Sequence, residues 1–164
     1  ALDLNYLASI IADIVSKHEG LKGVLLFPQK DHLVISLPHN LFFAAGRSEV
    51  SDEGKKALFV LGGSLVHILN RIEVIGHADP RPIEQSRSGY DSNWELSLRR
   101  ALSVADILEN VGYDRGIITR GLSSARYNEL PQEWSEAKKL DLSRRVDIMI
   151  MKDDGTTREY MDFK

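Results

Sequence analysis

Apolar residues recur along this chain with two periods, and these periods predict which segments form helices and which form strands. In residues 4–15 the spacing is three or four residues, the repeat of an amphipathic helix about three turns long. Its apolar positions are Leu4, Leu7, Ala8, Ile11 and Val15. We expect this helix to pack on its own domain. The alternative is a contact with a partner or a link to an upstream segment.

Two short apolar segments, residues 23–27 and 32–37, flank the turn-forming residues 28–31 and predict a β-hairpin. Leu33, Ile35 and Leu37 alternate with other residues and would share one face of it. The next segment, residues 41–46, is expected to be a loop with apolar anchors.

A long helix is predicted to begin after Ser51, because a serine followed by two acidic residues suits a helix start. Its buried stripe would consist of Leu58, Leu61, Leu65 and Ile68. Two glycines at 62–63 lie in the middle of this pattern. Each costs about 1 kcal/mol relative to alanine, so we expect a neighbouring element to approach closely there.

A second long helix is predicted between a capping box and a glycine. Ser92 and Glu95 match the S-x-x-E pattern, and the helix would end at Gly112. Its expected core stripe is Trp94, Leu98, Ala101, Ala105 and Leu108.

Short strands are predicted over residues 71–76, 117–120 and 145–151. Residues 122–143 are expected to be a long polar loop with at most one helical turn, around residues 133–138. The order of elements predicts an α/β (α+β) domain with a single mixed β-sheet and helices packed against it. We expect residues 1–22 to be a helix and linker, 23–153 the globular domain, and 154–164 a polar tail.

Composition narrows the function classes. A chain of 164 residues with 43% hydrophobic and 27% charged residues is an ordinary globular domain. A net charge of −3 without a Lys/Arg block argues against nucleic acid as a partner. The absence of cysteine excludes disulfides, thiolate metal sites and a cysteine nucleophile. No apolar run approaches the roughly 18 residues that span a bilayer. Because the chain begins at Ala1, we expect any targeting or membrane segment to lie upstream.

The candidate chemistry lies in two motifs. The strand ending Gly76-His77-Ala78-Asp79 puts a carboxylate on a turn, and Asn93, Ser97 and Arg100 share one face of the second long helix. An aspartate can face an ammonium and an arginine can fork onto a carboxylate, so the pair predicts a site for a zwitterion. The alternatives are an Asx turn for Asp79, local capping for Asn93 and a surface ion pair for Arg100. Arg99 is expected to face solvent.

Other polar residues give weaker signals. Arg144 and Arg145 are either a solvated charge pair or a second basic wall of the site. His77 could be a base or a metal ligand, but no third ligand stands nearby. Glu84 and Asp91 share the loop with Asp79, without the fixed separation that hydrolysis by paired carboxylates needs. No nucleophile or nucleotide motif occurs, so we predict no catalytic site, metal or cofactor.

Together, these motifs resemble the OmpA-like peptidoglycan-binding family, whose hallmarks are G-H-[TA]-D, N-x-x-L-S-x-x-R-A and a terminal N-R-R-V strand. The resemblance covers roughly residues 33–151, with Ser143 where the family usually has asparagine. It implies a non-covalent hold on the diaminopimelate-type residue of the peptidoglycan stem peptide. The residues that it implies for this binding are Ala78, Asp79, Asn93, Ser97, Arg100, Arg144 and Arg145.

Within the family the sequence is most similar to the flagellar stator branch, the MotB type. This similarity implies a periplasmic domain, not an enzyme, that anchors a motor complex of bacterial motility and chemotaxis to the cell wall. It also implies a homodimer and a MotA-type partner, reached through an upstream helix in the inner membrane that is absent from this sequence. The alternatives are an outer-membrane lipoprotein or secretion-system anchor, and a wall amidase that uses His77 and Asp79 around a metal.

Overall fold

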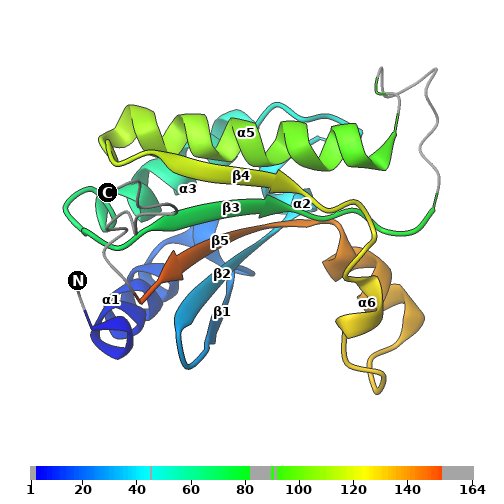
Figure 1. Cartoon of the computed structure of the whole chain (residues 1–164), viewed down its shortest axis with the longest axis horizontal. Helices are drawn as coiled ribbons and strands as arrows, with labels where there is room; N and C mark the ends of the chain where they lie inside the picture. Colours follow the sequence, from blue (N-terminus) through cyan, green and yellow to red (C-terminus); the bar gives the residue numbers. More distant parts are fainter. Residues whose placement is uncertain (1–2, 45, 82–89, 91, 153–164) are drawn as a thin grey trace, which may run out of the picture.

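The computed structural model describes residues 3–44, 46–81, 90 and 92–152 and contains one five-stranded mixed sheet (Figure 1). The strands are β1 Leu25–Pro28, β2 His32–Pro38, β3 Ile72–Gly76, β4 Ile117–Gly121 and β5 Arg145–Met151. Their order in the sheet is β1-β2-β5-β3-β4. Only β3 and β4 pair in parallel, across the connection that contains the long helix α5. The predicted single mixed sheet with helices packed against it is therefore confirmed.

Helices precede β1 and lie between the later strands, whereas β2 follows β1 without a helix between them. They are α1 Leu4–Lys17, α2 His39–Phe42, α3 Asp52–Gly63, α5 Asn93–Val111 and α6 Glu136–Ser143, with 3₁₀ turns at Glu19–Leu21 and Tyr127–Glu129. None of the helices in the described part of the chain is long and apolar enough to cross a bilayer.

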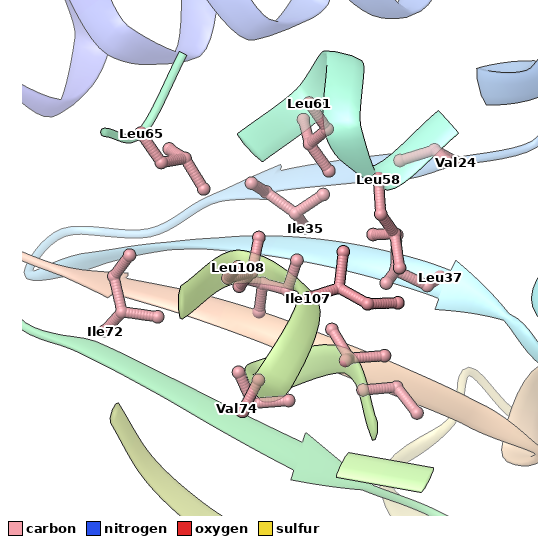
Figure 2. Packing of buried hydrophobic residues seen from close by; sticks show 14 of the residues in the cluster. Val24, Ile35, Leu37, Leu58, Leu61, Leu65, Ile72, Val74, Ile107 and Leu108 are labelled. Carbon is pink, nitrogen blue, oxygen red and sulfur yellow. The ribbon is translucent and has the colours of Figure 1, made fainter. Parts of the chain in front are cut away.

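The core lies between one face of the sheet and helices α1, α3 and α5. Because alternate residues of a strand point to opposite faces, the predicted set Leu33, Ile35 and Leu37 is fully buried on the helix side. Figure 2 shows Ile35 and Leu37 packed close to Leu58 and Leu61 of α3. Each fully buried side chain of this size contributes about 1.5–3 kcal/mol relative to its exposed state.

Helix α1 forms as predicted and packs on its own domain. Asp3 caps it by accepting hydrogen bonds from the backbone N–H groups of Asn5 and Tyr6. Leu7 and Ile11 are buried in the same core as the sheet. The predicted division at residue 22 stays a prediction, and the predicted polar tail at 154–164 lies outside the described residues.

Helix α3 is shorter than its apolar pattern predicts. It begins after the predicted cap Ser51 but ends at Gly63, so Leu65 and Ile68 are buried by the turns that follow rather than by the helix. A Cβ on Gly62 would lie 3.3 Å from Val111, which confirms the close approach at that position. At Gly63 the space is open, and the paired glycines instead favour the end of the helix.

The predicted core stripe of α5 is partly wrong. Its boundaries at Ser92 and Gly112 are confirmed, but Trp94 and Leu98 are exposed. The face directed at the sheet carries the small residue Ser97 and the charged residue Arg100, both buried. Apolar spacing could not show this, because α5 has apolar residues on both sides of its buried face.

The segment 122–143 was predicted as a loop and contains a true helix. Ser135 caps α6 by accepting a hydrogen bond from the backbone N–H of Lys138, and the helix runs for eight residues. Its polar sequence gave no apolar stripe to find. The expected loop at 41–46 is also partly wrong, because residues 41 and 42 belong to the short helix α2; the apolar residues Phe42 and Phe43 are buried.

Candidate functional site

The candidate site begins where β3 ends. The backbone N–H of His77 donates to the carbonyl of Arg145, and that of Ala78 donates to the carbonyl of Ser123. This segment therefore runs between β5 and the chain that leaves β4. A Cβ on Gly76 would lie 1.9 Å from the carbonyl oxygen of Ser97, so only glycine lets α5 cross here. These contacts fix Asp79 relative to α5.

Asp79 is buried and held by two arginines. Its Oδ1 accepts from the backbone N–H of Arg81 at 2.8 Å, and its Oδ2 lies 2.8 Å from Arg81 Nη2 and 3.0 Å from Arg144 Nε. Burial alone would raise the pKa of Asp79, but the hydrogen bonds from Arg81 and the charges of Arg81 and Arg144 bring the pKa below its usual value. Asp79 is thus a carboxylate at neutral pH. Asp79 therefore forms the Asx turn that was given as its alternative role, and it forms the two ion pairs as well.

Arg100 is buried as well, which contradicts its alternative as a surface ion pair. Its Nε donates to the carbonyl of Arg47 at 2.8 Å, and its guanidinium lies 5.0 Å from the ring centre of Phe43. Burial lowers the pKa of Arg100 to about 10, so the side chain stays charged at neutral pH. Within the described residues no ion pair joins Arg100 to Asp79.

His39 shows that these charged groups occupy one corner of the molecule. Its backbone N–H donates to the carbonyl of Arg144 at 2.9 Å. Burial, followed by the charges of Arg144 and Arg100, lowers the pKa of His39 to about 4, while Asp141 and Asp79 act in the opposite direction. Since all these groups act on one imidazole, Arg100, Arg144 and Asp79 lie around His39. We name this set, Arg100, Arg144, Asp79 and His39, the charged corner.

The charged corner has an excess of positive charge. Asp79 pairs with Arg81 and Arg144, Arg100 adds a further positive charge that acts on His39, and the exposed Asp141 lies 3.5 Å from Arg144. This arrangement suits a ligand that carries an ammonium and more than one carboxylate.

Three predicted site residues hold this corner in place. Asn93 Nδ2 donates to the carbonyl of Arg81 at 2.8 Å and lies 3.3 Å from that of Asp79, while the helix cap is Ser92; the capping alternative for Asn93 is wrong. Ser97 accepts a hydrogen bond from the backbone N–H of Ser123. Ala78, which directly precedes Asp79 in the chain, is buried.

Arg145 and His77 belong to a second cluster. Arg145 Nε lies 3.1 Å from Oδ1 of the buried Asp147, His77 Nε2 lies 3.1 Å from its Oδ2, and Ser36 donates to it at 2.5 Å. Burial raises the pKa of Asp147, but the hydrogen bond from His77 and the charge of Arg145 lower it below its usual value. The structure thus brings Arg144, and not Arg145, to Asp79.

The wall-amidase alternative required His77 and Asp79 to lie together around a metal. In the structure His77 pairs with Asp147 instead of Asp79. Across the described ranges no group of three His, Asp or Glu residues could hold a metal ion. The expected solvent exposure of Arg99 is confirmed, and its side chain lies 3.7 Å from Glu95.

Several residues of the site were not predicted from the sequence. Arg81 stands two residues after Asp79, and the Asx turn could have indicated it. Arg47 contributes a backbone carbonyl, and Phe43 and His39 come from a distant segment, so no spacing rule reveals them. Residues 82–84 and Asp91 lie outside the described residues.

Comparisons with known proteins agree with the motifs. The model of the OmpA family matches residues 42–139. Motility protein B of Escherichia coli K12 is 28% identical over 118 residues, which cover 72% of this chain but only 37% of that protein. The match to a MotB-like protein from Desulfovibrio vulgaris has a TM-score of 0.78 at 16% identity, covers 91% and 94% of the two chains, and shows the shared fold. The similarity to MotB-type proteins is thus confirmed.

A further solved structure is the cell wall anchor of the T6SS from Pseudomonas aeruginosa. It is 29% identical with a TM-score of 0.72, and the match covers 90% of this chain and 97% of that one.

Proposed function

Because the chain belongs to the OmpA family, we propose that it is a non-catalytic periplasmic domain that binds peptidoglycan and anchors a larger complex to the cell wall. The observation that carries this proposal is the charged corner, where Asp79, Arg100 and Arg144 converge from three separate segments of the chain.

The proposed ligand is the diaminopimelate-type residue of the stem peptide. It carries an ammonium for Asp79 and carboxylates for the guanidinium groups of Arg100 and Arg144. Asp79 already has two arginine partners, so the ligand ammonium shares or displaces the exposed Arg81. The ligand carboxylates then balance the positive charge that remains.

The other predicted site residues take positioning roles in this proposal. Asn93 ties the loop of Asp79 to α5, and Ser97 holds the backbone of Ser123, whose carbonyl accepts a hydrogen bond from Ala78. Arg145 acts from the second cluster, where it neutralises Asp147 and holds the start of β5.

The proposed anchoring role suits two kinds of complex, a flagellar stator and a secretion system. As a flagellar stator domain, suggested by the similarity to Motility protein B, the chain would act as a homodimer with a MotA-type partner through a membrane helix outside this sequence. As a secretion-system anchor, suggested by the type VI relative at 29% identity, it would hold a secretion apparatus instead. Deletion of the gene distinguishes the two: loss of swimming with intact secretion supports the stator, and the reverse supports the secretion system.

Sedimentation with purified sacculi tests peptidoglycan binding. We expect Asp79→Asn and Arg100→Lys to weaken binding roughly ten- to a hundredfold, because each removes a charge-assisted hydrogen bond worth about 1.5–3 kcal/mol. Arg99→Lys is the matched control, since it makes the same change at the exposed neighbouring position.

Thermal unfolding of each variant separates a loss of binding from a loss of fold. Folded Asp79→Asn and Arg100→Lys proteins that still pellet with sacculi like the wild type would refute the assignment.

A further inference from the structure

An exposed apolar stripe runs along α5. Trp94, Leu98 and Leu102 follow one another at four-residue spacing, and 54%, 39% and 39% of their surfaces are exposed. They make up a third of the nine large apolar side chains that the described residues leave exposed. The rest of the described domain does not cover them, and exposed apolar patches of this kind mark interaction surfaces. We name these three residues the α5 stripe.

The α5 stripe overhangs the free edge of the sheet. The backbone of Ser97 lies against Gly76 of β3, and the backbone of Leu98 lies against Gly121 of β4. Moving around the helix from Ser97 to Leu98 therefore leads from the inner strand β3 toward β4, which ends the sheet. Figure 1 shows α5 running along β4 at this border.

This border combines two features that proteins usually cover. An edge strand offers unpaired backbone groups to another chain, and β4 has no proline and only one charged side chain, Arg120, to discourage such pairing. Ile118 adds an exposed apolar side chain on the far face of the same strand. A cover for the α5 stripe would protect the edge as well.

We propose that the cover is a second copy of this chain, with the two α5 helices packed antiparallel about a two-fold axis near Leu98. In this arrangement Leu98 meets its own copy, and Trp94 faces Leu102 of the second copy. The inference extends the proposed function, of which pairing of two copies is a part, by naming the surface that pairs.

The charged residues beside the α5 stripe are complementary to those of a second copy of the same helix. Glu95 and Arg99 follow the stripe residues by one position and lie side by side on each helix. Antiparallel pairing reverses their order across the axis, so Glu95 of one copy approaches Arg99 of the other, twice. A partner helix with a like-charged border would lack this match.

Sedimentation of the wild type and two variants tests the proposal. We expect the wild type to dimerise, and Leu98→Glu to weaken the dimer at least about tenfold because it puts two carboxylates at the axis. Phe59→Glu is the control, since Phe59 is an exposed apolar residue, at 52% against 39% for Leu98, that lies on α3, outside the stripe. A wild type that remains monomeric at every concentration, or a Leu98→Glu dimer as tight as the wild type, would overturn the proposal.

Disulfide trapping gives a second readout that does not depend on affinity. The chain has no cysteine, so single-cysteine variants report only the introduced position. Leu98→Cys should form a disulfide dimer under mild oxidation, because its Cβ meets its own copy within the roughly 3.5–4.5 Å that a disulfide needs. Phe59→Cys should not, and equal trapping of the two would contradict the proposed axis.

Binding of soluble stem peptide by the monomeric Leu98→Glu variant keeps the two proposals apart. Arg100 is two residues further along, about 200° around the helix, so the substitution leaves the charged corner unchanged. Intact binding to soluble stem peptide with loss of the dimer supports both proposals, whereas loss of binding by Asp79→Asn alone concerns only the ligand.

Discussion

Arg100 lies inside the domain while its neighbour Arg99 lies in solvent, although the two are adjacent in the sequence and chemically identical. The difference comes from their places around α5: Arg100 points to Phe43 and the Arg47 carbonyl, and Arg99 points to Glu95. Burial holds the guanidinium of Arg100 in one orientation, which favours a fixed ligand geometry. The sequence motif singled out Arg100, and the fold explains how its side chain is held.

The lowered pKa of His39 predicts how the stability of the folded protein depends on pH. The unfolded chain binds a proton on this side chain below its ordinary pKa of 6.5, whereas the folded protein resists protonation down to a pKa of about 4. The unfolded state therefore takes up more protons in that window, and stability falls as the pH drops from 6.5 toward 4. Allowing for partial exposure, we expect a loss of roughly 1–3 kcal/mol from this group.

His39→Gln provides the measurement, because glutamine keeps a hydrogen-bonding side chain that does not titrate. Melting temperatures of the wild type and of the variant should converge as the pH falls through the window. The lowered pKa values of Asp79 and Asp147 affect stability mainly around and below the ordinary aspartate pKa of 3.8, and both proteins keep these carboxylates. Parallel pH profiles for the two proteins would contradict the role of His39.

At the scale of elements, two glycines predict opposite effects of the same substitution. Gly76→Ala would press a Cβ onto the Ser97 carbonyl at 1.9 Å and force β3 and α5 apart, which we expect to cost about 3 kcal/mol or more. Gly63→Ala meets no atom within 4 Å and lies in the last turn of α3, so we expect it to be neutral or stabilising by about 0.5–1 kcal/mol.

Urea unfolding of the two glycine variants checks this pair. Equal stability of Gly76→Ala and the wild type would mean that α5 does not cross β3 as closely as the structure has it.

Sequence patterns predicted some of these elements and not others. All five strands, and the boundaries of α5, follow from period, capping box and glycine, because these signals are local. The buried face of α5 and the helix α6 do not follow, because the first depends on which side meets the sheet and the second has no apolar stripe. Three of the four residues of the charged corner, Asp79, Arg100 and Arg144, belong to the sequence motifs. His39 is brought to them only by the tertiary fold.

For the molecule as a whole, the N-terminal helix is part of one cooperative unit. Ile11 of α1 is fully buried in the core that the sheet shares with α3 and α5. We expect Ile11→Ala to cost about 2–5 kcal/mol and to lower the melting temperature of the entire domain. The neighbouring Ile10, which is only partly buried, should tolerate the same change at less than about 1.5 kcal/mol. A separate, early transition for α1 alone would argue against a single core.

The position of β5 has a consequence for the order of events in the cell. This strand comes last in the described chain, yet it lies between β2 and β3 and follows directly on Arg144, which pairs with Asp79. Until it is synthesised, the two halves of the sheet have no common neighbour and the arginine is missing. Under the proposed function, a growing chain would therefore bind the wall only after this strand has been synthesised.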